Sequence, residues 1–129
     1  MMLSVSELTA HAFADAINRQ SVEDLTRLMT DDHLFIDSLG VQVQGRDQVT
    51  AGWAAYFRMV PDYTITIEET YSDGNAVAML GTAQGTYAAT KWQTPAAWKV
   101  RIHGALVAEW RVYADNEPIR AIMRRNSAH

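Results

Sequence analysis

Asp37 is the residue of this chain whose type and surroundings most strongly suggest chemistry. It ends a short apolar run, Leu34-Phe35-Ile36, and Gly40 follows it at the spacing of a tight turn. A carboxylate that an apolar strand carries inward needs a hydrogen-bonding partner, a ligand or water, because burying it bare is costly. Two interpretations follow. Asp37 is a base that moves protons in an apolar pocket, or it begins the turn through Gly40 and accepts hydrogen bonds from backbone N–H groups there.

The aromatic side chains suggest an apolar pocket near this carboxylate. Tyr56 and Phe57 follow Trp53 at helical spacing, and a later strand carries small residues beside Met79. These side chains either fill the core or outline a pocket for a flat apolar ligand, in which indole N–H and tyrosine O–H groups supply the polar contacts. The chain has four tryptophans: Trp53, Trp92, Trp98 and Trp110.

The histidines give no metal-site pattern, because none of the four is paired at i,i+4 or i,i+2. The absence of cysteine excludes thiolate catalysis and cysteine-based metal sites. We therefore expect no metal and no other cofactor, and we interpret His33 as an ordinary surface histidine at the start of a strand. The histidines are His11, His33, His103 and His129.

Length and charge narrow the class of protein. A chain of 129 residues with 48% hydrophobic and 20% charged residues predicts one globular domain over residues 1–129. A net charge of −4 argues against a nucleic-acid partner. The first residues lack the basic and apolar regions of a signal peptide, and no apolar run approaches the roughly 20 residues of a membrane span. We expect a cytoplasmic protein with no membrane partner.

Helical patterns come first along the chain. Apolar residues at helical spacing predict helices over residues 4–17, 21–29 and 46–60, and Pro61 ends the third. Alternating residues after Pro61 then predict strands. Helices followed by antiparallel strands predict an α+β fold in which the helices close one face of a curved sheet. The predicted strands are 63–68, 76–87, 96–102 and 105–114, with a loop over 88–95 and a basic helical turn around 118–124.

Gly81 and Gly85 lie on one face of the predicted strand 76–87. Because glycine weakens a strand, this stripe predicts either a bend or space for a bulky group.

Two segments resemble known families. Residues 13–32, followed by Phe35-Ile36-Asp37-Ser38-Leu39-Gly40, resemble the first third of bacterial ketosteroid isomerases. Residues 109–115 resemble the last strand of SnoaL-like polyketide cyclases and limonene-epoxide-hydrolase-like proteins. The order of elements resembles the nuclear transport factor 2-like fold. This resemblance implies a cone-shaped, mostly antiparallel sheet with three helices from the N-terminal half on its concave face, and a homodimer.

The isomerase resemblance implies a role for Asp37. In that family the matching carboxylate moves a proton beside a carbonyl, and two donors hold the enolate oxygen. Phe13 and Trp98 stand at or near the donor positions here, and losing one such donor costs about 10²–10³ in rate, so authentic steroid isomerisation is disfavoured. The N–H of Trp53 or Trp98, or the hydroxyl of Tyr56, is a candidate replacement.

The cyclase resemblance implies that Asp115 is an acid or base near the chain end. The alternative is that Asp115 caps the turn after the last strand. Strand alternation places Asp115 and Trp110 on opposite faces of the sheet unless a bulge intervenes. Epoxide hydrolysis is disfavoured, because Thr82-Ala83-Gln84 stands where that family has an Arg-x-Asp pair.

We therefore predict a cofactor-independent isomerase or cyclase of the SnoaL-like type, acting on a small hydrophobic carbonyl compound, with Asp37 and Asp115 as the catalytic residues. Two alternatives stay open: a homodimeric protein that binds a hydrophobic ligand without chemistry, and a dimerising scaffold whose pocket is core. The predicted pocket residues are Phe13, Trp53, Tyr56, Met79, Trp98 and Trp110.

Overall fold

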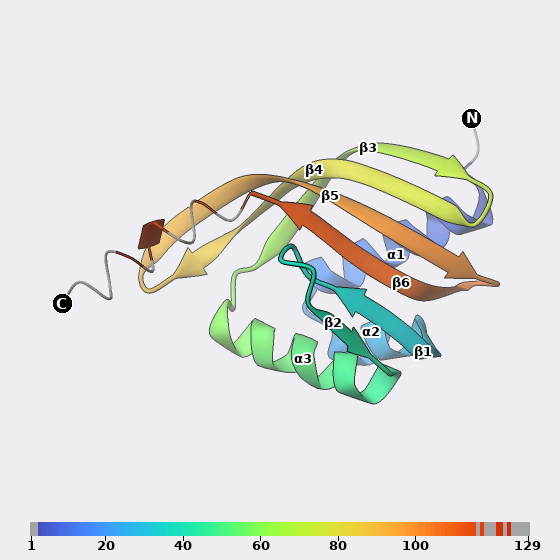
Figure 1. Cartoon of the computed structure of the whole chain (residues 1–129), viewed down its shortest axis with the longest axis horizontal. Coiled ribbons are helices and arrows are strands. Elements are labelled where there is room, and N and C mark those ends of the chain that lie inside the picture. The colour runs from blue at the N-terminus through green and yellow to red at the C-terminus, as the bar shows by residue number, and fades with distance from the viewer. Residues whose placement is uncertain (1–2, 116, 118–120, 123, 125–129) are drawn as a thin grey trace.

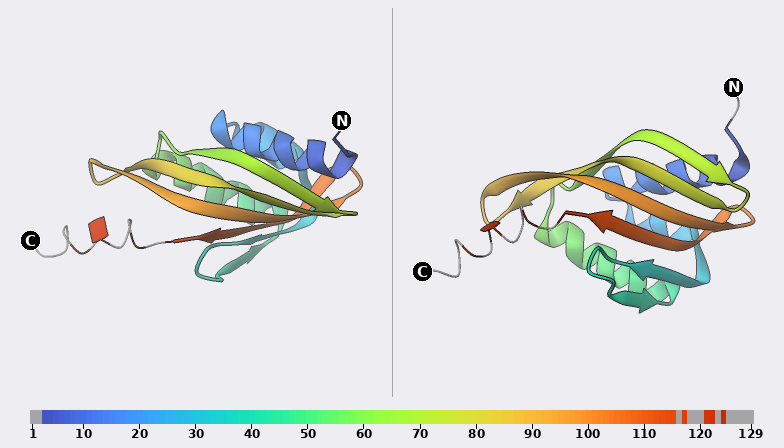
Figure 2. Two further views of the ribbon diagram at one scale, coloured as in Figure 1. Left: turned by 90° about the horizontal axis from the view of Figure 1, so that it is seen from above. Right: turned by 45° about the horizontal axis from the view of Figure 1, so that its top comes forward.

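The computed structural model describes residues 3–115, 117, 121, 122 and 124. Three helices pack against one face of a curved six-stranded sheet, as Figures 1 and 2 show. The strand order is β2-β1-β6-β5-β4-β3, and every neighbouring pair is antiparallel except β1 and β6. This architecture confirms the predicted α+β fold. The elements are α1 (Val5–Asn18), α2 (Val22–Arg27), β1 (Met29–Ile36), β2 (Gln42–Gln44), α3 (Arg46–Met59), β3 (Thr64–Asp73), β4 (Ala76–Tyr87), β5 (Thr90–His103) and β6 (Leu106–Ala114).

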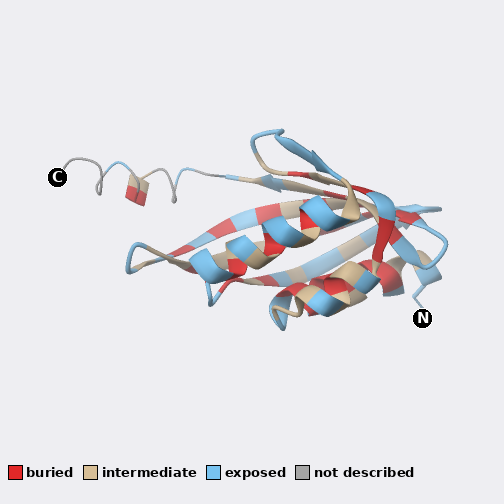
Figure 3. Ribbon diagram, turned by 90° about the horizontal axis from the view of Figure 1, so that it is seen from below, coloured by how far each residue is buried: buried red, intermediate tan, exposed pale blue. Residues whose placement is uncertain are grey.

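The helix starts follow the local sequence. Ser4 and Glu7 form a capping box on α1, in which the Glu7 N–H donates to Ser4 Oγ at 3.1 Å. Ser21 caps α2 by accepting from the Asp24 N–H at 3.2 Å. Buried and exposed residues alternate around the helices, so that one face of each meets the sheet (Figure 3). None of the helices in the described part of the chain is long and apolar enough to cross a membrane.

The predicted loop over residues 88–95 is wrong. Tyr87 pairs directly with Thr90, and the two residues between them, Ala88 and Ala89, form the turn with φ values of 51° and 65°. Such a turn normally carries Asn-Gly, so two alanines gave no hairpin signal. Pro95 lies inside β5, paired with Thr82, although proline is rare in a central strand.

The glycines of β4 are explained by the protein's own packing. A Cβ on Gly81 would lie 1.7 Å from the Thr66 carbonyl oxygen, beside the irregular pairing of β3 with β4. A Cβ on Gly85 would lie 2.6 Å from Val60 Cγ1 and 3.2 Å from Trp92 Cζ2. The stripe therefore accommodates a bend at Gly81 and the Trp92 ring at Gly85, and no ligand is needed to explain it.

The core lies between the helices and the sheet and is rich in aromatic rings. The rings of Phe13 and Trp110 are 4.7 Å apart, and those of Trp98 and Trp110 are 6.4 Å apart. All three side chains are at most 1% exposed. The predicted helical turn around 118–124 falls largely outside the described residues.

Candidate functional site

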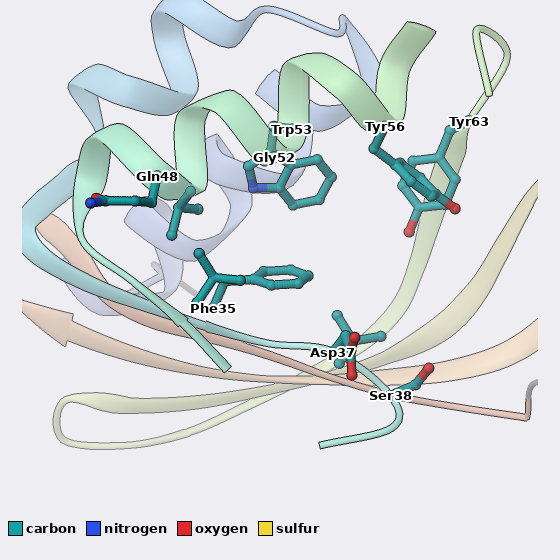
Figure 4. Close-up of a pocket in the computed structure, with 11 residues that line it drawn as sticks. Phe35, Asp37, Ser38, Gln48, Gly52, Trp53, Tyr56 and Tyr63 are labelled. Atoms are coloured by element: carbon teal, nitrogen blue, oxygen red, sulfur yellow. The ribbon is translucent and has the colours of Figure 1, made fainter. Parts of the chain in front are cut away.

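A pocket of about 390 Å³ opens between α3 and the hairpin formed by β1 and β2. Its volume falls in the range of small-molecule sites. Figure 4 shows Trp53 on one side and Phe35 on the other, with Asp37, Ser38 and the two tyrosines at one end and Gln48 at the opposite end. The lining residues are Phe35, Asp37, Ser38, Val43, Gln48, Val49, Gly52, Trp53, Tyr56, Tyr63 and Val112.

Asp37 borders this pocket and also closes the turn after β1. Its Oδ1 accepts the backbone N–H groups of Leu39 and Val41, each at 2.9 Å. Its carbonyl accepts the Gly40 N–H at 3.0 Å, with Gly40 at a φ of 86°. The turn interpretation is therefore confirmed. Both amides hold the Asp37 carboxyl group in one position at the pocket edge.

Two tyrosines bring hydroxyl groups to the same end of the pocket. Tyr56 comes from α3 and Tyr63 from the turn before β3, and their rings meet edge to face with centroids 4.9 Å apart. Both hydroxyls point toward the side formed by Asp37 and Ser38 (Figure 4). Burial raises the pKa of Tyr56 to about 12. Burial, followed by the neighbouring Tyr56 phenol, raises the pKa of Tyr63 as well, so both rings are neutral donors at neutral pH.

Tyr63 is the site residue that sequence reasoning missed as a pocket donor. Alternation with Ile65 predicts only that it belongs to a half-buried strand. The available signal was its position two residues after Pro61, because a proline that ends a helix turns the chain before the next strand begins.

The rest of the pocket wall is apolar. The rings of Phe35 and Trp53 lie 5.7 Å apart at 75°, and Trp53 lies 6.4 Å from Tyr56. Gly52 faces open space, because a Cβ built there would meet nothing within 4 Å. A ligand in this pocket would contact aromatic faces along its length, the hydroxyl and carboxyl groups at one end, and Gln48 at the other.

Four of the six predicted pocket residues lie beneath this pocket and do not line it. Trp53 and Tyr56 are lining residues. The other four are at most 1% exposed, because they fill the space between α1 and the centre of the sheet. The indole N–H groups of Trp98 and Trp110 have no hydrogen-bond partner among the described residues. The buried four are Phe13, Met79, Trp98 and Trp110.

Asp115 lies outside the pocket lining. It follows β6, is exposed, and its Oδ1 accepts the Glu117 N–H at 3.0 Å. Thr94 Oγ1 donates to the Asp115 carbonyl at 2.8 Å. This is the turn-capping arrangement, and the structure does not bring Asp115 together with Asp37 in one pocket.

The interpretation of His33 as a surface residue is wrong, because its side chain is 0% exposed. β1 begins at Met29, earlier than the sequence pattern indicated, so His33 lies within the strand and faces the core. Its Nδ1 lies 2.7 Å from the Val107 carbonyl oxygen, and since a carbonyl only accepts, Nδ1 carries the proton. Desolvation lowers the pKa of His33, which favours the neutral ring.

The profile of the SnoaL-like domain matches residues 10–120. This chain belongs to the SnoaL-like domain family. A search of curated proteins found no match to this SnoaL-like protein.

Solved structures share the fold of this SnoaL-like protein. A protein assigned as a SnoaL-like polyketide cyclase from Shewanella denitrificans superimposes with a TM-score of 0.85 at 13% identity, covering 95% of this chain and 99% of the other. A ketosteroid isomerase-like protein from Catenulispora acidiphila, in complex with trimethylamine, gives 0.80 at 22% identity, with 88% and 89% covered. An epoxide hydrolase from Mycobacterium tuberculosis that resembles limonene epoxide hydrolase gives 0.82 at 16% identity, with 93% and 90% covered. At these identities the likeness shows the fold alone, since this fold supports several chemistries.

Proposed function

We propose that this SnoaL-like protein is a cofactor-independent enzyme of the isomerase or cyclase type. Its substrate is a small, flat, hydrophobic compound with a carbonyl group. The observation that supports this proposal is that Asp37 lines the same pocket as a half-buried phenol, Tyr56, and a buried one, Tyr63. A carboxylate and two neutral donors on one apolar pocket are the groups that proton transfer beside a carbonyl requires.

In the proposed step Asp37 takes a proton from the carbon next to the substrate carbonyl. The C–H bond breaks, an O–H bond forms on the carboxyl group, and the electron pair moves to the carbonyl oxygen. Tyr56 and Tyr63 donate hydrogen bonds to the resulting enolate oxygen. Return of the proton to another carbon completes an isomerisation. In a cyclisation the enolate carbon attacks a second carbonyl of the substrate, a C–C bond forms as the π bond of that carbonyl opens, and Asp37 returns its proton to the new alkoxide oxygen.

A second candidate function is ligand binding without chemistry. The observation that favours it is that the Leu39 and Val41 amides already occupy Asp37 Oδ1, so one of the two carboxylate oxygens is engaged in the turn. An epoxide hydrolase has less support, because Asp37 is the one carboxylate and no arginine occurs among the residues that line the pocket.

The two functions are separated with 2-acetylnaphthalene, an aryl ketone whose methyl protons lie next to the carbonyl. Binding is followed by quenching of tryptophan fluorescence, since Trp53 lines the pocket. Exchange of the methyl protons in D₂O is followed by NMR. We expect Asp37→Asn to slow the enzyme-dependent exchange by at least about 10²-fold, with little change in the dissociation constant.

Asp73→Asn, at the exposed turn between β3 and β4, is the control and should exchange as the wild type does. Binding by the wild type with no exchange above the buffer rate would favour the non-catalytic function. Loss of exchange in Asp115→Asn alone would restore Asp115 as the catalytic carboxylate and remove Asp37 from that role.

A further inference from the structure

The end of α1 contacts the segment that carries Tyr63 into the pocket. Tyr63 lies in the turn between α3 and β3, one residue before the paired strand begins. The side-chain amide of Gln20 donates to the Pro61 carbonyl at 2.6 Å and lies 3.5 Å from the carbonyl oxygen of Tyr63 itself. The backbone on both sides of Asp62 is thus held from α1.

Asn18 holds the same segment two residues further on. Its Nδ2 donates to the Ile65 carbonyl at 2.9 Å, and its Oδ1 accepts the Ile65 N–H at 2.8 Å. β3 is an edge strand, so these backbone groups have no neighbouring strand on that side. The Asn18 amide pairs with them as a strand would.

Asp62 fixes the segment from the opposite side. Its carboxylate accepts the Thr86 N–H at 2.9 Å and the Thr86 hydroxyl at 2.6 Å. The Tyr63 ring then lies between two aromatic neighbours, 4.9 Å from Tyr56 and 6.1 Å from Trp92. Because the backbone around Tyr63 is held on both sides, the position of the Tyr63 hydroxyl depends on the hydrogen bonds that hold this backbone.

Gln20 occupies a backbone conformation that usually belongs to glycine. Its φ is 55°, and it follows the last residues of α1 in a Schellman arrangement, with the Ser21 N–H bonded to the Ala16 carbonyl at 3.0 Å. A residue with a side chain is unfavourable at this position. Glutamine therefore carries a backbone cost there, and the bonds of its amide to the Tyr63 segment offset that cost.

We infer that Gln20, supported by Asn18, is a positioning residue that sets where the Tyr63 hydroxyl stands in the pocket. This inference rests on the proposed function, because the position matters to a ligand only when Tyr63 donates to it. Gln20 is not among the residues that line the pocket, so it acts on the ligand through the segment that carries Tyr63.

The decisive variant is Gln20→Gly. It removes the side-chain amide and supplies the residue that the left-handed conformation favours, so the overall stability should stay close to that of the wild type. We expect the Tyr63 ring to gain freedom. In NMR of the protein labelled with ¹³C-tyrosine, the Tyr63 signal, assigned with Tyr63→Phe, should shift, and the pKa of Tyr63 should fall toward the ordinary tyrosine value.

Ligand affinity supplies the second readout. The dissociation constant of 2-acetylnaphthalene should rise about tenfold in Gln20→Gly, the order expected for losing one well-placed hydrogen bond. That of 2-ethylnaphthalene, which has no carbonyl, should change less than about twofold. Gln20→Glu keeps the side-chain length but lacks the amide donor. It should raise the dissociation constant of 2-acetylnaphthalene as Gln20→Gly does.

Ala89→Gly is the matched control, because Ala89 also has a positive φ, of 65°, and lies at the β4–β5 turn, outside the residues that line the pocket. It should leave the Tyr63 signal and both dissociation constants unchanged. The inference is overturned when the Tyr63 signal of Gln20→Gly matches the wild type, or when both ligands weaken equally with a loss of stability, which would indicate a purely structural role. Failure of the wild type to bind 2-acetylnaphthalene would count against the proposed function, whereas the Tyr63 signal would still decide the role of Gln20.

Discussion

At the scale of single residues, Asp37 combines two roles that sequence reasoning treats as alternatives. Its Oδ1 organises the turn through two backbone amides, while the same side chain borders the pocket. A carboxyl group held in this way keeps one position beside the ligand. The exchange experiment with Asp37→Asn measures directly whether the same side chain also moves a proton.

His33 gives a prediction about acid stability. The folded protein keeps His33 neutral, because desolvation lowers its pKa, whereas the unfolded chain takes up a proton below the ordinary value of about 6.5. The unfolded state therefore binds more protons as the pH falls, and the free energy of unfolding should decrease by up to about 1.4 kcal/mol per pH unit from this residue. The contribution of His33 to the free energy of unfolding is present above about pH 6.5 and is lost as the pH falls below that value.

Urea denaturation between pH 8 and pH 5 checks this prediction. His33→Gln should show a shallower decrease in unfolding free energy over that range than the wild type, even though it starts from a lower stability. His103→Gln, at the exposed last residue of β5, controls for the loss of one histidine. Equal slopes for His33→Gln and the wild type would show that His33 is not the group responsible.

At the scale of elements, α3 both packs on the core and forms one wall of the pocket. Val49, Trp53 and Phe57 are its buried stripe, while Gly52 leaves a gap beside Trp53. Glycine inside a helix destabilises it relative to alanine. Gly52 faces the pocket with open space where a Cβ would lie. It therefore leaves volume for a ligand and lowers the stability of α3.

Substitution of Gly52 tests whether this position lowers helix stability and leaves volume for a ligand. Gly52→Ala should raise the free energy of unfolding by about 0.5–1 kcal/mol, since the added Cβ meets no neighbour and the helix gains propensity. Gly52→Leu should occupy the pocket and weaken binding of 2-acetylnaphthalene at least about tenfold, with no loss of fold. Denaturation curves and fluorescence titrations measure the two effects. Unchanged binding in Gly52→Leu would place the ligand elsewhere.

At the scale of the whole molecule, the sheet face away from the helices carries exposed apolar side chains in one row. Ala97 of β5 pairs with Leu80 of β4 and with Tyr113 of β6, and the latter two are 40% and 44% exposed. An apolar row of this kind on a sheet is typical of a surface that another chain covers. We propose that a second copy of the chain covers it, which gives the homodimer expected from the family resemblance.

Sedimentation velocity tests the dimer. The wild type should sediment as a dimer, and Leu80→Arg should shift it toward the monomer, because the charge would be buried at the centre of the shared face. Leu8→Arg changes a residue that is also exposed, at 55%, but lies on α1 on the other side of the sheet, and it should remain dimeric. A monomeric wild type would contradict the proposal.

The sequence by itself determined the order of helices and strands and the turn at Asp37. These features depend on neighbours in the chain: helical or alternating spacing, the Ser4 capping box, and the short reach from Asp37 to the amides of Leu39 and Val41. It also placed Trp53 and Tyr56 on the inward face of the third helix, and left open whether that face fills the core or lines a pocket. Local periodicity is sufficient for such predictions, because it fixes which side of an element a residue occupies.

Only the tertiary structure decided which buried aromatic residues line the pocket and which fill the core. Trp53, Trp98 and Trp110 have the same chemistry and similar burial, yet only Trp53 borders the cavity. The difference depends on how far α3 stands from the β1–β2 hairpin, a distance between segments that no spacing along the chain contains. For the same reason, only the structure shows that Tyr63 lines the pocket and that its carbonyl contacts the side-chain amide of Gln20, 43 residues away.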